Sequence, residues 1–197
     1  MGDKKFEIYF DCGSSKIRAG AFNKNNPKET FYFESKFFHD SSSMESNIKE
    51  IISLLEENTK EYINDVNLMI DSLEMKSIGI SISKKLDGSK LKEEYIQFLI
   101  QDAKQQILKY YGDQTIIHIM VMNNKIDNVE YATLPDEINC NLISLDILFV
   151  CISKETTEYF KKIFSQFDIL LNKFICTSYA KSNNYKNNFS FADNLLF

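Results

Sequence analysis

The chain has 197 residues, of which 44% are hydrophobic and 26% charged, values ordinary for a globular protein, so disorder is not the default expectation. Lys and Arg number 23 against 28 Asp and Glu, and they form no basic stripe, so we expect no nucleic-acid partner. No apolar run approaches the roughly 20 residues of a membrane-spanning helix, so nothing within this chain is expected to cross a membrane.

Cysteine and histidine spacing does not indicate a metal site. No two cysteines form a CxxC pair, and the only histidines are His39 and His118. His118 lies in an apolar run and is predicted to be a packed residue, and His39 is predicted to lie on the surface near a turn. We expect all four cysteines to be buried, reduced thiols. They are Cys12, Cys140, Cys151 and Cys176.

The first seventy residues predict the order strand, strand, strand, helix, strand. Phe6, Ile8 and Phe10 alternate with polar neighbours, and turn residues follow each of the first two strands, which indicates an antiparallel meander. The predicted strands are residues 6–10, 17–22, 30–38 and 66–70, and the amphipathic helix is 44–63, capped by the polar residues 40–43. This order is the opening of a ribonuclease-H-like unit.

The remainder predicts a second mixed segment. Strands are expected over residues 73–83, 115–122, 125–133, 142–152 and 169–177, and helices over 90–110, with Ser89 as N-cap, and 154–167. Residues 181–188 are rich in asparagine and are predicted as a loop. Residues 189–197 become apolar again and are predicted as the start of a strand, so we expect a fragment of a longer protein. An aromatic cluster is expected in the core: Phe31, Tyr32, Phe33, Phe37 and Phe38.

The residues that carry chemistry lie between the first two strands, in the stretch FEIYFDCGSSKIRAG. Gly13 lets the backbone approach a ligand closely, and successive N–H groups in such a turn form an anion-binding concavity. Ser14 and Ser15 add hydroxyl donors, and Lys16 adds a positive charge. Asp11 is suited to hold a hydrated Mg²⁺. The stretch therefore predicts a phosphate site, with a plain hairpin turn as the alternative.

A P-loop is excluded, because that motif has a longer glycine loop ending in Gly-Lys-Ser/Thr before a helix, whereas a strand follows here. The segment FDCGSSKIRAG instead resembles the phosphate-1 motif of the actin-like ATPase superfamily, in the form found in the FtsA family of cell-division proteins. Later segments resemble the same family in order, among them DVNLMIDSLEMKSIGISIS, GSKLKEEYIQFLIQDAKQQI, TIIHIMVMNNKID, LISLDILFVCIS and ILLNKFICTSYA.

The resemblance implies an α/β (α+β) fold: a ribonuclease-H-like actin-type subdomain 1A, with an inserted SHS2-like subdomain 1C. Subdomain 1A would take residues 1–83 and 168–197, and subdomain 1C residues 84–167. It also implies ATP and Mg²⁺ as ligands. Asp11 would lie near the metal, through water, and the phosphates would contact Gly13, Ser14, Ser15 and Lys16.

FtsA-like proteins bind ATP mainly as a structural ligand and have at most weak ATPase activity. They polymerise, tether FtsZ filaments to the cytoplasmic face of the inner membrane at the division septum, and recruit other division proteins. Their membrane contact is made by a C-terminal helix, which we do not expect within this chain. Alternatives are a PilM-like pilus-assembly scaffold of the same fold, a sugar-kinase-like enzyme of the superfamily, and a degenerate scaffold without nucleotide binding.

Overall fold

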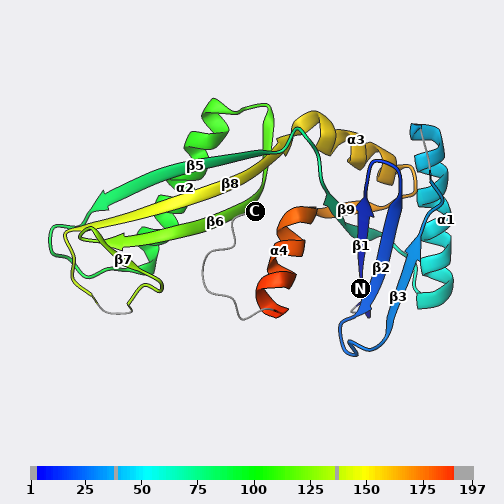
Figure 1. Cartoon of the computed structure of the whole chain (residues 1–197), viewed down its shortest axis with the longest axis horizontal. Helices are drawn as coiled ribbons and strands as arrows, with labels where there is room; N and C mark the ends of the chain where they lie inside the picture. The colour runs from blue at the N-terminus through cyan, green and yellow to red at the C-terminus, as the bar shows by residue number, and fades with distance from the viewer. Residues whose placement is uncertain (1–3, 38–39, 136–137, 189–197) are drawn as a thin grey trace. The chain divides into compact units, whose positions relative to one another are not determined.

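A computed structural model of the chain describes residues 4–37, 40–135 and 138–188 (Figure 1). The chain forms two compact units. The first unit comprises Met1–Leu73 with Glu155–Phe197, and the second unit is Glu74–Lys154. Each unit has its own sheet, and each is described by itself below.

The first unit is built on a mixed five-stranded sheet in the order β3-β2-β1-β4-β9. Its strands are β1 (Phe6–Cys12), β2 (Ile17–Asn23), β3 (Thr30–Glu34), β4 (Asp65–Ile70) and β9 (Leu170–Cys176). The strands β1, β2 and β3 pair antiparallel as the predicted meander, while β4 pairs parallel with both β1 and β9. Parallel neighbours bring the carboxyl ends of β1, β4 and β9 to one edge of the sheet.

Two helices bury one face of this sheet, α1 (Ser41–Thr59) and α3 (Lys154–Ser165). The buried stripe of α1 packs on β2 and β3, and Phe164 of α3 meets Phe10 of β1 edge to face, with ring centroids 5.2 Å apart. The N-cap predicted for α1 is confirmed, because the Asp40 carboxylate accepts a 2.7 Å hydrogen bond from the Ser43 N–H. The core is therefore the ordinary apolar contact of a helix layer with a sheet face.

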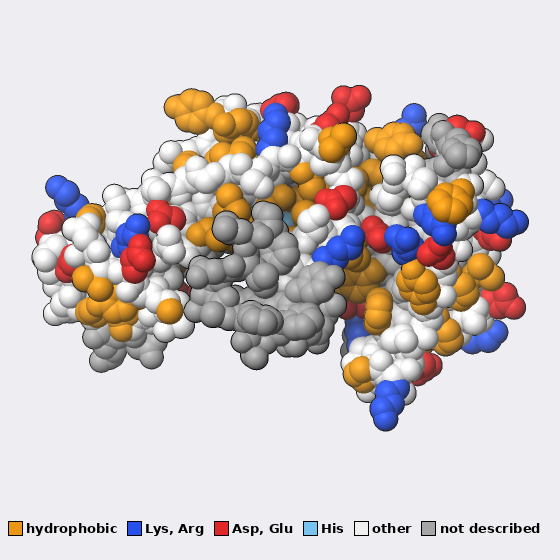
Figure 2. Space-filling view, viewed as in Figure 1, with side chains coloured by type: hydrophobic (Ala, Val, Ile, Leu, Met, Phe, Trp, Pro, Cys, Tyr) orange, Lys and Arg blue, Asp and Glu red, His pale blue; other side chains and the backbone are white. Residues whose placement is uncertain are grey.

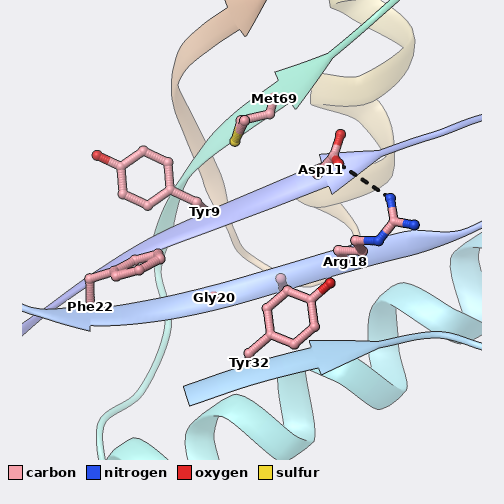
Figure 3. A pocket seen from close by; sticks show the side chains of 8 residues that line it. Tyr9, Asp11, Arg18, Gly20, Phe22, Tyr32 and Met69 are labelled. Atoms are coloured by element: carbon pink, nitrogen blue, oxygen red, sulfur yellow. Dashed lines mark ion pairs between the residues drawn. The ribbon is translucent and has the colours of Figure 1, made fainter. Parts of the chain in front are cut away.

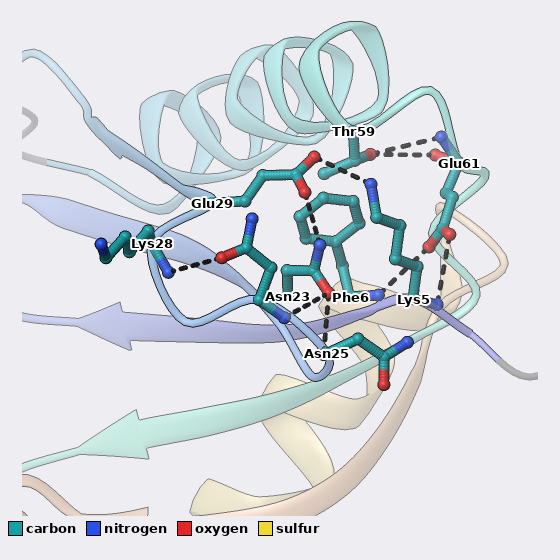
Figure 4. Close-up of polar contacts among 9 residues, drawn as sticks. Lys5, Phe6, Asn23, Asn25, Lys28, Glu29, Thr59 and Glu61 are labelled. Carbon is teal, nitrogen blue, oxygen red and sulfur yellow. Dashed lines mark hydrogen bonds and ion pairs between the residues drawn. The ribbon is translucent and has the colours of Figure 1, made fainter.

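Polar contacts connect neighbouring segments at the end of the sheet where β1 begins (Figure 4). Glu29 accepts from Lys5 Nζ at 2.8 Å and from Asn23 Nδ2 at 2.5 Å, and Asn23 Oδ1 caps the following turn by accepting from the Asn25 N–H. Glu61 accepts from the N–H of Lys5 at 3.2 Å. These carboxylates hold the start of β1 and the β2–β3 turn in place.

The second unit is a four-stranded antiparallel sheet in the order β5-β8-β6-β7, with one helix on it. Its elements are β5 (Lys76–Lys85), α2 (Glu93–Tyr110), β6 (Gln114–Ile126), β7 (Val129–Tyr131) and β8 (Leu142–Ser153). The α2 stripe of Leu99, Ala103 and Ile107 packs on the β8 residues Leu145 and Phe149 in a single apolar cluster. The β8 residues Ile143, Ile147 and Cys151 belong to the same cluster, with Ile126 of β6 and the loop residues Leu86, Leu91 and Cys140, and the β5 isoleucines pack against it partly buried.

The unit boundaries differ from the predicted subdomain boundaries at residues 83/84 and 167/168. The strand β5 belongs to the second unit because it pairs with β8 along its whole length, from Lys76 to Lys85. The helix α3 belongs almost entirely to the first unit because its buried face, with Phe164, packs on β1. Both boundaries are set by pairing and packing between residues that are distant in the sequence. Sequence periodicity gives no information on such contacts.

Three local predictions were wrong. Residues 114–126 form one long strand, β6, which turns into β7 through Asp127 and Asn128, both at positive φ as a tight hairpin turn requires. Ser89 does not cap α2, which begins at Glu93 without a side-chain cap, because Ser89 lies in a turn and donates its N–H to the Leu86 carbonyl. Residues 181–188 are not a loop.

That last segment belongs to the helix α4 (Thr177–Asn188), which has no glycine or proline to interrupt it. Asparagine favours caps and turns, but residue propensity is a weak prior that the context of the fold overrides, so composition alone mispredicted the segment. The strand predicted over residues 189–197 lies outside the described residues, as does His39. No helix in the described part of the chain is long and apolar enough to cross a membrane.

Predictions about cysteine and His118 agree with the structure. All four cysteines are free and buried. Burial raises the pKa of the Cys12 thiol, so it stays protonated and is no nucleophile. His118 lies on β6 opposite Val150 and is half-buried, and this burial lowers its pKa. The imidazole is therefore neutral at pH 7, as expected of a packed residue.

Candidate phosphate-binding edge

The predicted phosphate loop lies at the edge of the sheet where the parallel strands of the first unit end. Cys12 of β1 pairs with Ile70 of β4, and Ile70 pairs with Cys176 of β9, so the three strands stop at the same level. In open α/β sheets, ligands bind outside the carboxyl ends of the parallel strands. The residues that follow these ends form the candidate site.

The loop itself is a four-residue connection, Gly13 to Lys16, between paired Cys12 and Ile17. The Gly13 N–H donates to the Lys16 carbonyl at 3.0 Å, and a Cβ at Gly13 would lie only 3.1 Å from that oxygen. Within the described residues, the N–H groups of Ser14, Ser15 and Lys16 have no protein acceptor. The loop therefore offers three consecutive backbone donors and two serine hydroxyls, which is a donor set that suits a phosphate.

Asp11 lies at the base of this loop and is held from two sides. Its Oδ1 accepts a 3.3 Å hydrogen bond from Thr177 at the start of α4. Its Oδ2 lies 3.7 Å from Arg18 Nη1 (Figure 3). Directly after the neighbouring strand β4, the Asp71 carboxylate accepts a 2.8 Å hydrogen bond from Ser178. Two carboxylates and two hydroxyl side chains thus surround the carboxyl ends of β1, β4 and β9.

Glu34 neutralises the positive side chains of the loop. Its Oε1 forms an ion pair with Lys16 Nζ, and its Oε2 accepts from Arg18 Nε at 3.1 Å. The hydrogen bonds from Lys16 and Arg18 hold the pKa of Glu34 below its ordinary value, so it is ionised at neutral pH. The Lys16 ammonium also lies 4.4 Å from the ring centroid of Phe37. Lys16 is thus directed to β3 and not to the centre of the loop.

An aromatic hollow of about 180 Å³ lies next to Asp11, on the sheet face opposite α1 and α3 (Figure 3). Tyr9, Phe22, Tyr32 and Met69 line it. The predicted aromatic core is therefore wrong in part, since Tyr32 is 63% exposed and Phe37 67% exposed. Residues alternate faces along a strand, so Tyr32 points away from half-buried Phe31 and Phe33. Phe38 lies outside the described residues.

Metal ligands do not cluster at this edge. Among residues 4–37, 40–135 and 138–188, no group of three or more His, Cys, Asp or Glu side chains could hold a metal ion directly. Mg²⁺ usually keeps several waters and takes one or two carboxylates with substrate phosphates, so a single carboxylate at Asp11 fits a water-mediated contact. The surface in view mixes Lys and Arg with Asp and Glu (Figure 2).

The comparison with known proteins shows the fold alone. No protein-family model matches the sequence, and no curated protein is similar to it. The chain is similar to a solved structure of the PilM–PilN type IV pilus biogenesis complex, with a TM-score of 0.58 and 7% sequence identity. That similarity covers 92% of this chain and 50% of the other. This chain therefore spans about half the length of the structure that it matches.

Two weaker structural matches have TM-scores below 0.5. One is the cytoplasmic domain of EpsL, an inner-membrane component of the type II secretion system of Vibrio cholerae (TM-score 0.43, 8% identity, 87% of this chain and 57% of that chain). The other is a Bacteroides thetaiotaomicron protein with an actin-like ATPase fold and unknown function. Its TM-score is 0.39 at 19% identity, and the match covers 94% of this chain and 57% of that chain.

The chain has a mixed α/β architecture with two sheets, and it shares its fold with the PilM–PilN structure. The predicted fold class is confirmed. The SHS2-like character of the inserted unit, the FtsA family and the nucleotide contacts stay predictions. The structure does bring Asp11 and the loop Gly13–Lys16 together at one edge, and it adds three residues that sequence reasoning missed: Arg18, Glu34 and Thr177. Of these residues, only Arg18 and Glu34 could have been matched from the sequence, because the predicted hairpin of β2 and β3 places them on neighbouring strands.

Substituting Glu34 by Gln is expected to tighten ATP binding about fivefold, because the change frees two cations beside the loop from a competing carboxylate. Calorimetric titration of MgATP measures the effect. Glu29→Gln is the matched control, since Glu29 also binds a lysine, Lys5, but at the opposite end of the sheet. Unchanged or weaker ATP binding by Glu34→Gln would show that these cations do not contact phosphate.

Proposed function

We propose that the chain is the nucleotide-binding part of an FtsA-type actin-like adaptor. In this proposal it binds ATP with Mg²⁺ at the loop Gly13–Lys16, as a structural ligand with at most weak hydrolysis. The whole protein then polymerises, tethers FtsZ to the cytoplasmic face of the inner membrane at the septum and recruits other division proteins. The observation that carries the proposal is the row of unused N–H donors from Ser14 to Lys16, placed beside Asp11 at the carboxyl ends of the parallel strands.

The residues of this edge fit a nucleotide phosphate with its metal. The three N–H groups and the hydroxyls of Ser14 and Ser15 would bind phosphate oxygens, which carry the negative charge that such donors favour. Bound Mg²⁺ would neutralise phosphate charge, and Asp11 would orient its water shell. Lys16 and Arg18 would give up their ion pairs with Glu34 and bind phosphate instead, since Lys16 ends the loop and Arg18 lies two residues further along β2.

A second candidate is a PilM-like scaffold of pilus assembly. The observation in its favour is the similarity to the PilM–PilN structure over 92% of this chain. That structure is a complex, so a protein partner is common to both candidates. They differ in the partner's identity: an FtsZ filament in the first case, and the cytoplasmic tail of an inner-membrane pilus protein in the second.

Binding of the full-length protein to immobilised FtsZ is expected, with higher affinity in MgATP than in EDTA, because ATP stabilises the binding-competent form. Biolayer interferometry against FtsZ and against a PilN-type cytoplasmic tail separates the candidates. Binding to the pilus tail alone would replace the first candidate by the second. Binding to neither partner, with or without MgATP, would overturn both.

A further inference from the structure

The strand β5 leaves one edge of the second unit's sheet unpaired. It pairs with β8 and stands first in the order β5-β8-β6-β7, and no other strand of the described residues joins its other side (Figure 1). An unpaired edge presents a row of N–H and C=O groups, which is a template for another strand. Natural proteins protect such edges with bulges, prolines or charges.

The middle of β5 carries none of these protections. The ladder to β8 runs from Lys76 to Lys85 without a register shift, whereas the β6–β8 ladder is interrupted twice. The seven residues Ser77–Ser83 contain no charge and no proline. A Cβ on Gly79 would meet nothing within 4 Å, so a neighbouring strand would find open space on that face. The edge is regular and uncharged over the length of an ordinary strand.

The opposite face of β5 offers an apolar shelf. Ile78, Ile80 and Ile82 are only partly buried against the core, although they line its edge. Beside them on α2, Phe98 is 55% exposed, and the Lys84 ammonium lies 4.8 Å from its ring centroid. An added strand that runs along β5 would therefore bury its own apolar side chains next to these isoleucines and Phe98.

The charges at the two ends of β5 indicate what kind of strand can pair with its free edge. Lys76 lies at one end, and Lys84 and Lys85 lie at the other, with no acidic residue on the strand. A second copy of the chain would pair β5 with β5, and the register that places Ile80 opposite Ile80 also places Lys76 opposite Lys84. Like charges directly opposite destabilise a strand pair. A segment with acidic ends meets the same lysines favourably.

We propose that the free edge of β5 is a docking site for an extended partner segment with an alternating apolar core and acidic residues at both ends, bound by strand addition. The backbone of β5 supplies the hydrogen bonds, the Ile78–Ile82 shelf supplies apolar burial, and the terminal lysines select the acidic flanks. This inference stands on the second unit alone and does not depend on nucleotide binding or on FtsZ.

The test uses the 197-residue chain and a fluorescein-labelled peptide, Glu-Glu-Thr-Val-Thr-Val-Thr-Val-Thr-Glu-Glu, followed by anisotropy. We expect binding that Lys76→Glu with Lys85→Glu weakens about tenfold, and a peptide with Lys in place of Glu should prefer that variant. Lys24→Glu with Lys28→Glu, which changes two exposed turn lysines and the net charge equally, should leave binding unchanged. Equal binding of both peptides to the wild-type chain would overturn the proposal.

Hydrogen exchange followed by NMR distinguishes strand addition from adhesion to the apolar shelf. We expect the acidic peptide to slow exchange at least tenfold at alternate β5 amides, those directed away from β8, because only these acquire a new acceptor. Protection confined to α2 would show that no strand is added. Sedimentation of the free chain as a dimer, with the same β5 amides already protected, would assign the edge to a second copy and overturn the proposal.

Discussion

Asp11→Ala is expected to weaken ATP binding 10- to 100-fold in Mg²⁺ and to leave it unchanged or slightly tighter in EDTA. A carboxylate that holds a metal through water contributes this much to metal affinity, whereas without metal the same carboxylate repels phosphate. Its place between Thr177 and Arg18 fixes it at the base of the loop. The ratio of the two affinities, measured by calorimetry, is therefore the diagnostic quantity.

The matched control is Asp65→Ala. Asp65 lies at the start of β4, at the other end of the same sheet, and its side chain is 29% exposed against 25% for Asp11. It is also ion-paired, with Lys4, so both variants lose a comparable contact. A purely structural role for Asp11 would lower affinity equally in Mg²⁺ and in EDTA. No ATP binding by the wild-type chain or by Asp11→Ala would support the degenerate scaffold instead.

Local patterns predicted the antiparallel meander of the first sheet because its information is local. The alternation of Phe6, Ile8 and Phe10, followed by turn residues, specifies a strand and a hairpin within a few positions. The same reasoning found the loop after Asp11, since glycine and serine there serve the backbone directly.

The rest of the site depends on contacts between distant residues. Thr177 reaches Asp11 across 166 positions, through the parallel pairing of β9 with β4 and of β4 with β1. Glu34 faces Lys16 and Arg18 only because β2 and β3 pair in the register Arg18 to Glu34. Sequence reasoning took Lys16 for a free cation, whereas the fold gives it an acidic partner. A charge can be assigned from sequence, but its neighbours cannot.

Phe10→Ala is expected to destabilise the first unit by about 3–5 kcal/mol, the largest effect on stability that we expect from a single substitution. Phe10 is fully buried at the centre of β1, and its ring packs edge to face on Phe164 of α3, a contact that adds to the loss of apolar burial. Native-state hydrogen exchange should show amides of β1 and β4 losing protection by about 100-fold or more.

Tyr32→Ala is the control for Phe10→Ala, because it also removes a large aromatic ring from the same sheet, but one that is 63% exposed. A change of less than about 0.5 kcal/mol is expected there. Equal, small losses in both variants would contradict the packing of α3 on β1, and with it the placement of α3 in the first unit. That placement matters for function, since α3 leads directly into β9, whose end brings Thr177 to Asp11. A cavity at Phe10 should therefore also weaken ATP binding.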